Sequence, residues 1–282
     1  MATTSSFVDG KPQASLSLND RGLNYGHGLF ETMRLFSGQL PLWRYHCQRL
    51  VMGAERLGIA HDSSRLERYL HQAREAFPTD GMLKLLLTAG VGPRGYRQQI
   101  PSASYALQYF PLPAVPRLRA LHLQLCDYAL PHNAQLAGIK HLNRLDQVLA
   151  AGELKEGYEG LLLDVDSNVV EALSSNIFLF DGQNWLTPEL QLCGVAGVMR
   201  RLLCEEIMPS LGHQVLVKPL ALTSLLSASE VFVCNAVRGI QPVCELEGLA
   251  RWTLEFSGSE TEKVITQLTQ TYPCFSAQCF VV

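Results

Sequence analysis

The stretch Leu136-Ala137-Gly138-Ile139-Lys140-His141-Leu142-Asn143-Arg144-Leu145 contains the clearest chemical signal in the chain. Lys140 follows a stretch that contains Gly138, and it has no acidic residue within five positions on either side. Apolar spacing from His141 to Gly152 predicts a helix, so we expect Lys140 at its N-terminus. A helix N-terminus with His and Arg nearby favours the neutral amine that attacks a carbonyl carbon. The stretch therefore predicts a lysine nucleophile, the alternative being a surface lysine at a helix start.

A second candidate is the acid in Asn168-Val169-Val170-Glu171-Ala172-Leu173-Ser174-Ser175-Asn176. Glu171 lies in an otherwise apolar stretch that predicts a strand, and a bend rich in hydroxyl and amide groups follows. A buried carboxylate requires a cationic partner. The alternative is a half-buried strand glutamate whose side chain faces water.

Three places are candidates for binding an anionic group. The first is Arg49, which lies on a predicted helix. The second is the start of the predicted helix Ala196–Met208, where Gly194 lies before the helix and Gly197 in its first turn, so that the first free N–H groups can bind a phosphate. Asn235 follows a predicted strand and offers a further donor. Each feature alone also fits an ordinary helix or turn.

The prolines between Tyr109 and Arg117 predict an extended connector, and we place a domain boundary there, with domains at 1–113 and 117–282. Helices are predicted at 44–57, 63–77, 141–152 and 196–208. Strands are predicted at 82–88, 105–110, 121–126, 161–165, 169–173, 177–180, 215–217 and 231–234. Each domain therefore mixes helices and strands, which predicts an α/β protein.

Composition excludes several classes of function. The net charge is −3 with a pI near 6.2 and no basic stripe, so a nucleic-acid partner is not expected. No apolar run reaches membrane-spanning length, and the histidines lack metal-ligand spacing, so neither a membrane nor a metal is expected. The N-terminus does not resemble a signal peptide, and the eight cysteines form no C-x-x-C pair. We therefore expect a cytoplasmic protein with reduced thiols.

Together these stretches resemble the fold-type IV pyridoxal-phosphate family, which includes branched-chain and D-amino acid aminotransferases and aminodeoxychorismate lyases. The resemblance covers most of the chain and is carried by residues 20–32, 46–50, 138–145, 171–178 and 194–200. Residues 137–149 look nearly the same as the lysine motif of the lyases, and Gly92-Pro93-Arg94-Gly95-Tyr96 looks like their Gly-Arg-Gly-Tyr loop.

This resemblance implies an α/β (α+β) fold with a small N-terminal domain, a larger barrel-like C-terminal domain and pyridoxal 5'-phosphate bound between them, in a homodimer. It implies conversion of a small-molecule substrate, 4-amino-4-deoxychorismate, into 4-aminobenzoate and pyruvate for folate biosynthesis. Lys140 and Thr32 would be the catalytic residues. The residues implied to bind the cofactor are Lys140, Glu171, Arg49, Val198, Met199, Ser175, Asn176, Asn235 and Asn143. Those implied to bind the substrate are Arg94, Arg34 and Tyr96.

Two positions depart from the family pattern. His27 stands where Asp is usual, and Arg144 stands where some aminotransferases have a tyrosine that contacts the cofactor, so Asn143 is expected to replace that contact. Two rival functions stay open. One is an aminotransferase of the same fold, which requires a 2-oxo acid. The other is a non-catalytic pyridoxal-phosphate-binding protein, which is disfavoured because all the motif residues are present.

Overall fold

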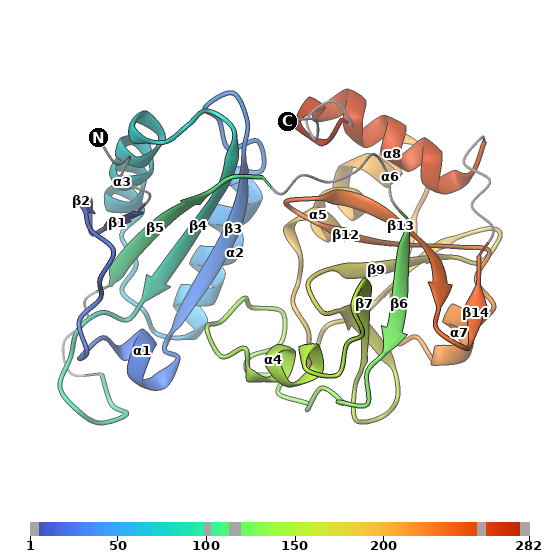
Figure 1. Ribbon diagram of the computed structural model, residues 1–282, viewed down its shortest axis with the longest axis horizontal. Helices are drawn as coiled ribbons and strands as arrows, with labels where there is room; N and C mark the ends of the chain where they lie inside the picture. The colour runs from blue at the N-terminus through green and yellow to red at the C-terminus, as the bar shows by residue number, and fades with distance from the viewer. Residues whose placement is uncertain (1–5, 99–102, 113–119, 253–257, 277–282) are drawn as a thin grey trace. The chain divides into compact units, whose positions relative to one another are not determined.

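The computed structural model describes residues 6–98, 103–112, 120–252 and 258–276. The chain forms two compact units, one of Met1–Pro113 with Ile139–Asn143 and one of Ala114–Gly138 with Arg144–Val282 (Figure 1). The predicted domain boundary between 113 and 117 lies outside the described residues. The segment Ile139–Asn143, which the sequence assigned to the C-terminal domain, groups with the first unit.

The first unit is built on a five-stranded antiparallel sheet in the order β2-β1-β5-β4-β3. Its strands are β1 (Ser6–Val8), β2 (Lys11–Pro12), β3 (Gly28–Leu35), β4 (Gly81–Thr88) and β5 (Ser104–Phe110). Its helices are α1 (Arg21–Tyr25), α2 (Trp43–Arg56) and α3 (Ser63–Ala76). β4 and β5 confirm predicted strands, whereas β3 was not predicted.

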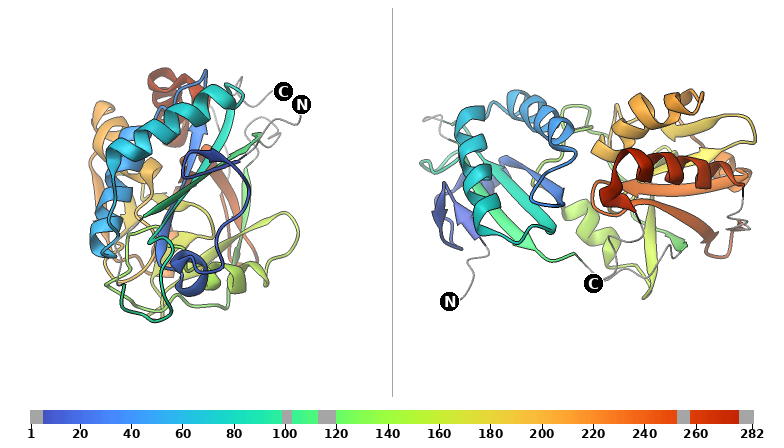
Figure 2. Two further views of the ribbon diagram at one scale, coloured as in Figure 1. Left: turned by 90° about the vertical axis from the view of Figure 1, so that its left-hand side faces the viewer. Right: turned by 90° about the horizontal axis from the view of Figure 1, so that it is seen from above.

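Alternation along β4 gives this sheet a buried face. Leu83, Leu85 and Leu87 are fully buried, while the residues between them are partly exposed. Both long helices cover one face of the sheet, α2 contacting β3 and α3 contacting β5 (Figure 2). Leu66 and Leu70, one helical turn apart on α3, are buried. The core of this unit therefore lies between the sheet and its two long helices.

The second unit is built on a nine-stranded mixed sheet in the order β11-β10-β9-β12-β13-β6-β7-β8, with β14 paired to β13. Its strands are β6 (Leu121–Leu125), β7 (Tyr158–Leu163), β8 (Val169–Ala172), β9 (Asn176–Phe180), β10 (Trp185–Pro188), β11 (Val215–Lys218), β12 (Glu230–Asn235), β13 (Gly239–Leu246) and β14 (Ala250–Arg251). β8, last in the order, also contacts β10, second from the other end. The sheet therefore curls into the expected barrel-like form.

Helices and a packed aromatic core complete the second unit. Its α-helices are α4 (Leu145–Ala151), α5 (Val198–Leu202), α6 (Met208–Ser210), α7 (Leu222–Leu226) and α8 (Glu260–Thr271), with a π-helical turn Leu203–Ile207 and a 3-10 turn Pro273–Phe275. The stretch from Val198 to Ser210 is continuously helical, which confirms the helix predicted there. The rings of Phe178 and Trp185 lie 5.0 Å and 4.9 Å from that of Phe232.

The helix predicted at 141–152 is wrong in its first four residues, because α4 begins at Leu145. Its apolar side chains Leu145, Val148 and Leu149 are exposed. Within the described ranges, no helix is both long enough and apolar enough to cross a bilayer.

Candidate active site

Lys140 lies in an extended segment that adds to the edge of β3. The backbone N–H of Phe30 donates to the carbonyl of Lys140 at 2.9 Å, and the N–H of Leu142 donates to the carbonyl of Gly28 at 3.0 Å. These backbone groups pair with a strand instead of with a following helical turn. The prediction that Lys140 begins a helix is therefore wrong, and its environment is a sheet edge.

The side chain of Lys140 lies over an aromatic ring on one face of β3. Its Nζ is 4.3 Å from the centroid of the Phe30 ring, a cation–π distance. Alternate residues of a strand share a face, so Thr32 and Arg34 lie on the same side of β3 as Phe30. The predicted hydroxyl donor Thr32 and the predicted substrate ligand Arg34 therefore lie on the face of β3 that the predicted nucleophile Lys140 contacts through Phe30.

Arg49 reaches β3 from α2 and binds Glu31. Its Nε donates to Oε1 of Glu31 at 2.8 Å, and its Nη2 donates to Oε2. His46, one turn earlier on α2, contacts the same Oε2 through Nδ1 at 2.6 Å. Glu31 and His46 are each 1% exposed and Arg49 is 8% exposed. The predicted phosphate ligand is therefore part of a buried, charged cluster.

Glu31 is ionised despite its burial. Burial alone would raise its pKa, but Arg49 and His46, through charge and hydrogen bonds, lower the pKa to about 2. The pKa of His46 is lowered, chiefly by burial and further by the positive charges of Arg49 and Lys140, although Glu31 opposes this. We therefore treat His46 as neutral at pH 7, with Nδ1–H donating to Glu31.

Glu171 lies on β8 in the second unit and is 5% exposed. Its Oε2 accepts from the backbone N–H of Val195 at 2.9 Å. Gly138, two residues before Lys140, pairs with Val195 in a parallel bridge. Glu171 is thus a buried carboxylate held by a segment that is itself paired with the chain leading into Lys140.

Three predicted polar residues of the second unit make hydrogen bonds through their side chains. Nδ2 of Asn176 donates to the carbonyl of Val195 at 2.9 Å, and Nδ2 of Asn235 donates to Oγ of Ser175 at 3.0 Å. Oδ1 of Asn235 accepts from the N–H groups of Val237 and Arg238. The structure therefore brings Ser175 and Asn235 together, and Asn176 at the start of β9 donates to the segment that binds Glu171.

The start of α5 has the form of an anion cradle. Gly197 precedes the helix and no side chain caps it, while Val198 and Met199 are buried. A Cβ at Gly197 would lie 1.9 Å from Oδ1 of Asn176, so only glycine fits there. Buried N–H groups at a helix start require an acceptor, and a phosphate is a suitable one. The start of α5 therefore fits the phosphate group of pyridoxal phosphate, and the amine of Lys140 is the kind of group that reacts with its aldehyde.

The loop that carries Arg94 and Tyr96 is held by α1. Arg21 donates from Nη1 to the carbonyl of Gly95 at 2.8 Å and from Nη2 to the carbonyl of Tyr96 at 2.6 Å. Both predicted substrate ligands on this loop are exposed, Tyr96 by 89%. Their roles stay predictions.

His27 and Asn143, the two positions linked to departures from the family pattern, contact the backbone. Nδ1 of His27 accepts from Nε of Arg21 at 3.3 Å, and its Nε2 lies 2.9 Å from the carbonyl of Leu57. Nδ2 of Asn143 donates to the carbonyl of Gly26 at 3.2 Å. His27 therefore contacts Arg21, the residue whose side chain holds the loop that carries Arg94.

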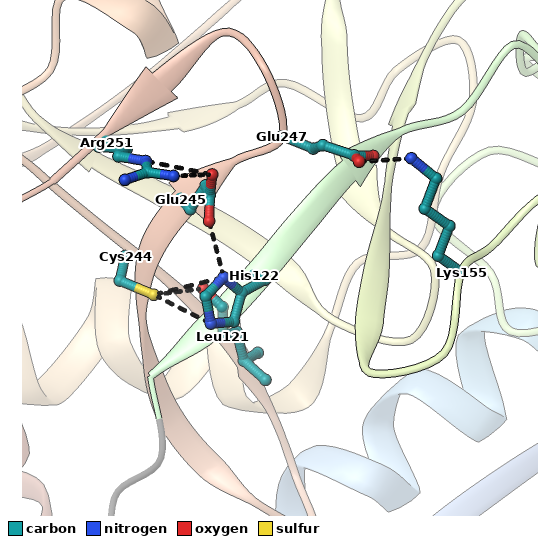
Figure 3. A network of polar contacts seen from close by, with 7 residues as sticks. All are labelled: Leu121, His122, Lys155, Cys244, Glu245, Glu247 and Arg251. Carbon is teal, nitrogen blue, oxygen red and sulfur yellow. Dashed lines mark hydrogen bonds and ion pairs between the residues drawn. The ribbon is translucent and has the colours of Figure 1, made fainter.

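A separate polar network lies on β6 and β13 (Figure 3). Nδ1 of His122 lies 3.0 Å from Oε2 of Glu245, and Sγ of Cys244 lies 3.8 Å from Nε2 and 3.9 Å from Nδ1 of His122. Burial raises the pKa of the Cys244 thiol, so the thiol stays protonated and is a poor nucleophile. Among the described residues, no group of three or more His, Cys, Asp or Glu is placed to hold a metal ion.

Two members of the buried cluster, Glu31 and His46, were missed by sequence reasoning. Glu31 stands between Phe30 and Thr32 in a stretch whose apolar pattern is interrupted by polar residues, unlike the stretch that contains Glu171. His46 stands one helical turn before Arg49, so both side chains project from one side of α2. The strand that carries Glu31 has no regular apolar pattern, so its local sequence does not indicate that Glu31 is buried.

Comparison with known proteins is consistent with this arrangement. Residues 28–246 match the model of the family described as amino-transferase class IV. The chain is 34% identical to aminodeoxychorismate lyase of Vibrio harveyi over 84% of this chain and 89% of that protein. The crystal structure of 4-amino-4-deoxychorismate lyase from Pseudomonas aeruginosa superimposes with a TM-score of 0.88 at 39% identity, covering 95% of this chain and 99% of that one. D-alanine aminotransferase of Bacillus licheniformis is 26% identical over 84% of this chain and 85% of its own length.

Proposed function

Because the chain belongs to the amino-transferase class IV family, whose members are pyridoxal-phosphate-dependent, we propose that it converts 4-amino-4-deoxychorismate into 4-aminobenzoate and pyruvate. The similarity to two aminodeoxychorismate lyases over most of the chain supports this reaction over transamination. The observation that carries it is the position of Thr32 on the same face of β3 as Phe30, over whose ring Lys140 lies. An amine and a hydroxyl on one face provide a base and an acid for an elimination.

Residues of both units are proposed to bind the cofactor. Lys140 would bind it covalently, and Glu171 would stabilise the protonated nitrogen of its ring. Arg49 binds its phosphate together with the N–H groups of Val198 and Met199. A further set of polar side chains completes the binding residues, namely Ser175, Asn176, Asn235 and Asn143.

The proposed reaction requires one proton to leave the substrate ring and one to reach the departing group. Bound pyridoxal phosphate withdraws electrons from the carbon that carries the substrate's amino group. The amine of Lys140 would be the base that removes the proton from this carbon. The bond between the ring and the enolpyruvyl oxygen then breaks, and the ring becomes aromatic. Thr32 or Lys140 delivers a proton to the methylene carbon of the departing enolpyruvate, which yields pyruvate.

Substrate recognition is proposed to rest on cationic and hydroxyl side chains of the first unit. The substrate carries two carboxylates, and arginine binds a carboxylate through two parallel hydrogen bonds. We propose Arg94 and Arg34 for this role, with Tyr96 as a further contact. Arg34 lies on the face of β3 that carries Thr32, whereas Arg94 and Tyr96 lie on the loop held by Arg21.

The experiment that tests this function supplies 4-amino-4-deoxychorismate without any 2-oxo acid. We expect 4-aminobenzoate and pyruvate in equal amounts, and neither from Lys140→Ala. In Thr32→Val, which keeps the shape of the side chain, we expect kcat to fall about 100-fold, the lower end of general-acid contributions, because Lys140 can also deliver the proton. A product that forms only when a 2-oxo acid is added would contradict the proposal.

An aminotransferase of the same family is the second candidate, and the similarity to D-alanine aminotransferase is what favours it. Such an enzyme passes an amino group to a 2-oxo acid and returns the cofactor to its aldehyde form in a second half-reaction. Amino-acid consumption that depends on a 2-oxo acid, without turnover of 4-amino-4-deoxychorismate, would identify this function.

We also propose that the protein is a homodimer in the cytoplasm. All the cysteines of the described residues, which are Cys47, Cys126, Cys193, Cys204, Cys234, Cys244 and Cys274, are free thiols. Reduced thiols are typical of that compartment.

A further inference from the structure

We propose that Glu31 is a positioning residue that orients Arg49 for the phosphate of the cofactor. This inference rests on the proposed function only in that Arg49 is taken as a phosphate ligand. Glu31 lies on β3 and Arg49 on α2, so the pair joins an edge strand to the helix that covers it.

The geometry of the pair fixes the plane of the guanidinium group. Two N–H groups on one side of Arg49, at Nε and Nη2, donate to the two carboxylate oxygens of Glu31. An arginine has five N–H groups in a rigid planar fork, so engaging two of them sets the directions of the other three. Glu31 therefore determines where the rest of Arg49 can donate.

Glu31 acts through Arg49 and not on the reacting atoms. It alternates with Phe30 and Thr32 along β3, so its carboxylate points away from the face on which Lys140 lies. It is 1% exposed, and its described side-chain contacts are Arg49 and His46. A group so placed has no access to the substrate.

His46 keeps the carboxylate in place without adding charge. Its Nδ1 contacts Oε2 of Glu31 at 2.6 Å, while its Nε2 is buried and has no hydrogen-bond partner within the described ranges. A neutral imidazole at this position leaves Glu31 and Arg49 as a balanced ion pair. Removing either charge would leave the other buried and uncompensated.

A positioning role and a purely electrostatic role for Glu31 predict opposite changes in the affinity for pyridoxal phosphate when Glu31 is replaced. If Glu31 only added negative charge near the phosphate, Glu31→Gln would tighten binding of a phosphorylated cofactor. If Glu31 positions Arg49, the same change releases the guanidinium fork and weakens that binding. The sign of the effect therefore separates the two roles.

The experiment compares pyridoxal phosphate with pyridoxal, which has the same aldehyde but no phosphate. Dissociation constants of both are measured by absorbance titration for the wild type, Glu31→Gln and Glu31→Asp. We expect both variants to lose about 10-fold to 100-fold in affinity for pyridoxal phosphate, the usual effect of residues that orient a ligating group. Affinity for pyridoxal should change by less than about 3-fold, a shift of well under 1.4 kcal/mol.

Asp20→Asn is the matched control, because Asp20 is also a buried acid of the first unit. It is 1% exposed, and its carboxylate accepts from the N–H of Gly22 and the hydroxyl of Thr88. Asp20→Asn should change the dissociation constants of pyridoxal phosphate and pyridoxal by the same factor. A ratio of the two dissociation constants that stays at the wild-type value in Glu31→Gln, or tighter binding of pyridoxal phosphate, overturns the proposal.

A double variant keeps the test decisive if Glu31→Gln folds poorly. Glu31→Gln with Arg49→Met removes both buried charges together and is expected to fold. Its ratio of dissociation constants should equal that of Arg49→Met alone, because Glu31 acts only through Arg49. A further change in the ratio would contradict the proposal. If the wild type itself fails to show a Lys140-dependent absorption band with pyridoxal phosphate, the proposed function fails instead.

Discussion

Glu31 and Glu171 are both buried on strands, and each is held by different neighbours. Glu31 faces Arg49 and His46, so its charge is compensated within the protein and its pKa is about 2. Glu171 accepts a hydrogen bond from the backbone N–H of Val195. In the proposed function, this buried carboxylate also pairs with a cation supplied by the cofactor.

Replacing Glu171 by Gln tests that pairing. Gln keeps an oxygen that can accept from Val195 but cannot hold a positive charge on the cofactor ring. We expect kcat/KM to fall at least about 100-fold, as when one electrostatic group is removed from an active site. Steady-state kinetics measures this, and thermal unfolding checks that the fold survives. Activity within a few-fold of the wild type would contradict the assigned role.

The pKa of Glu31 predicts a pH dependence of stability. Its ordinary value is 4.5 and its value in the folded protein is about 2. Between these two pH values the unfolded chain binds a proton at Glu31 and the folded chain does not. The contribution of ionised Glu31 to the free energy of unfolding is therefore complete above pH 4.5 and is lost as the pH falls towards 2. The difference in unfolding free energy between the wild type and Glu31→Gln should shrink over this range. Urea denaturation at several pH values measures it, and a constant difference would argue against the assignment.

At the level of secondary structure, the residue before α5, Gly197, has no room for a side chain. A Cβ at position 197 would lie 1.9 Å from Oδ1 of Asn176. We expect Gly197→Ala to lower the free energy of unfolding by about 1–3 kcal/mol, the usual effect of overpacking, and to weaken cofactor binding. Gly152→Ala is the control, because its Cβ would come no closer than 3.2 Å to the carbonyl of Leu149. Equal losses in both variants would contradict this reading.

Elements with a regular apolar pattern could be predicted from the sequence, whereas those stabilised by distant partners could not. The helix α2 and the strand β4 have local periodicity, and both were predicted. The strand β3 was not, because Glu31, Thr32 and Arg34 interrupt its apolar pattern. The segment around Lys140 was taken for a helix because its spacing continues that of α4. Its pairing with β3 depends on a strand far earlier in the chain.

The candidate site was likewise predicted only where the local sequence carries a signal. Lys140, Glu171 and Arg49 were identified from residue type and surroundings, because an isolated lysine, a buried acid and a helix arginine are local signals. The pair formed by Arg49 and Glu31 needs the packing of α2 on β3, which local spacing does not encode.

At the level of the whole molecule, α4 leaves an apolar face uncovered within one chain. Leu145, Val148 and Leu149 are 74%, 61% and 57% exposed. An exposed apolar cluster is typical of an interface, and we assign it to the second copy in the proposed homodimer. We expect Val148→Asp with Leu149→Asp to shift the protein towards the monomer in light scattering after size-exclusion chromatography.

Leu249→Asp provides the control for the dimer prediction. Leu249 is 51% exposed and lies in the turn before β14, away from α4 in the chain. This change should leave the dimer intact. A wild-type monomer, or a dimer that is insensitive to both substitutions on α4, would contradict the assignment.

The segment Ile139–Asn143 pairs with β3 of the first unit while its neighbours on both sides, Gly138 and Arg144, belong to the second. A polypeptide divided at residue 113 would therefore still hold its halves together, because the fragment 114–282 supplies a strand to the sheet of the fragment 1–113. Complementation between separately produced fragments is the natural consequence. Lys140 would then regain its neighbours on β3 only when the two fragments reassemble. Recovery of the absorption band of pyridoxal phosphate bound to Lys140 would therefore report that the segment has paired with β3.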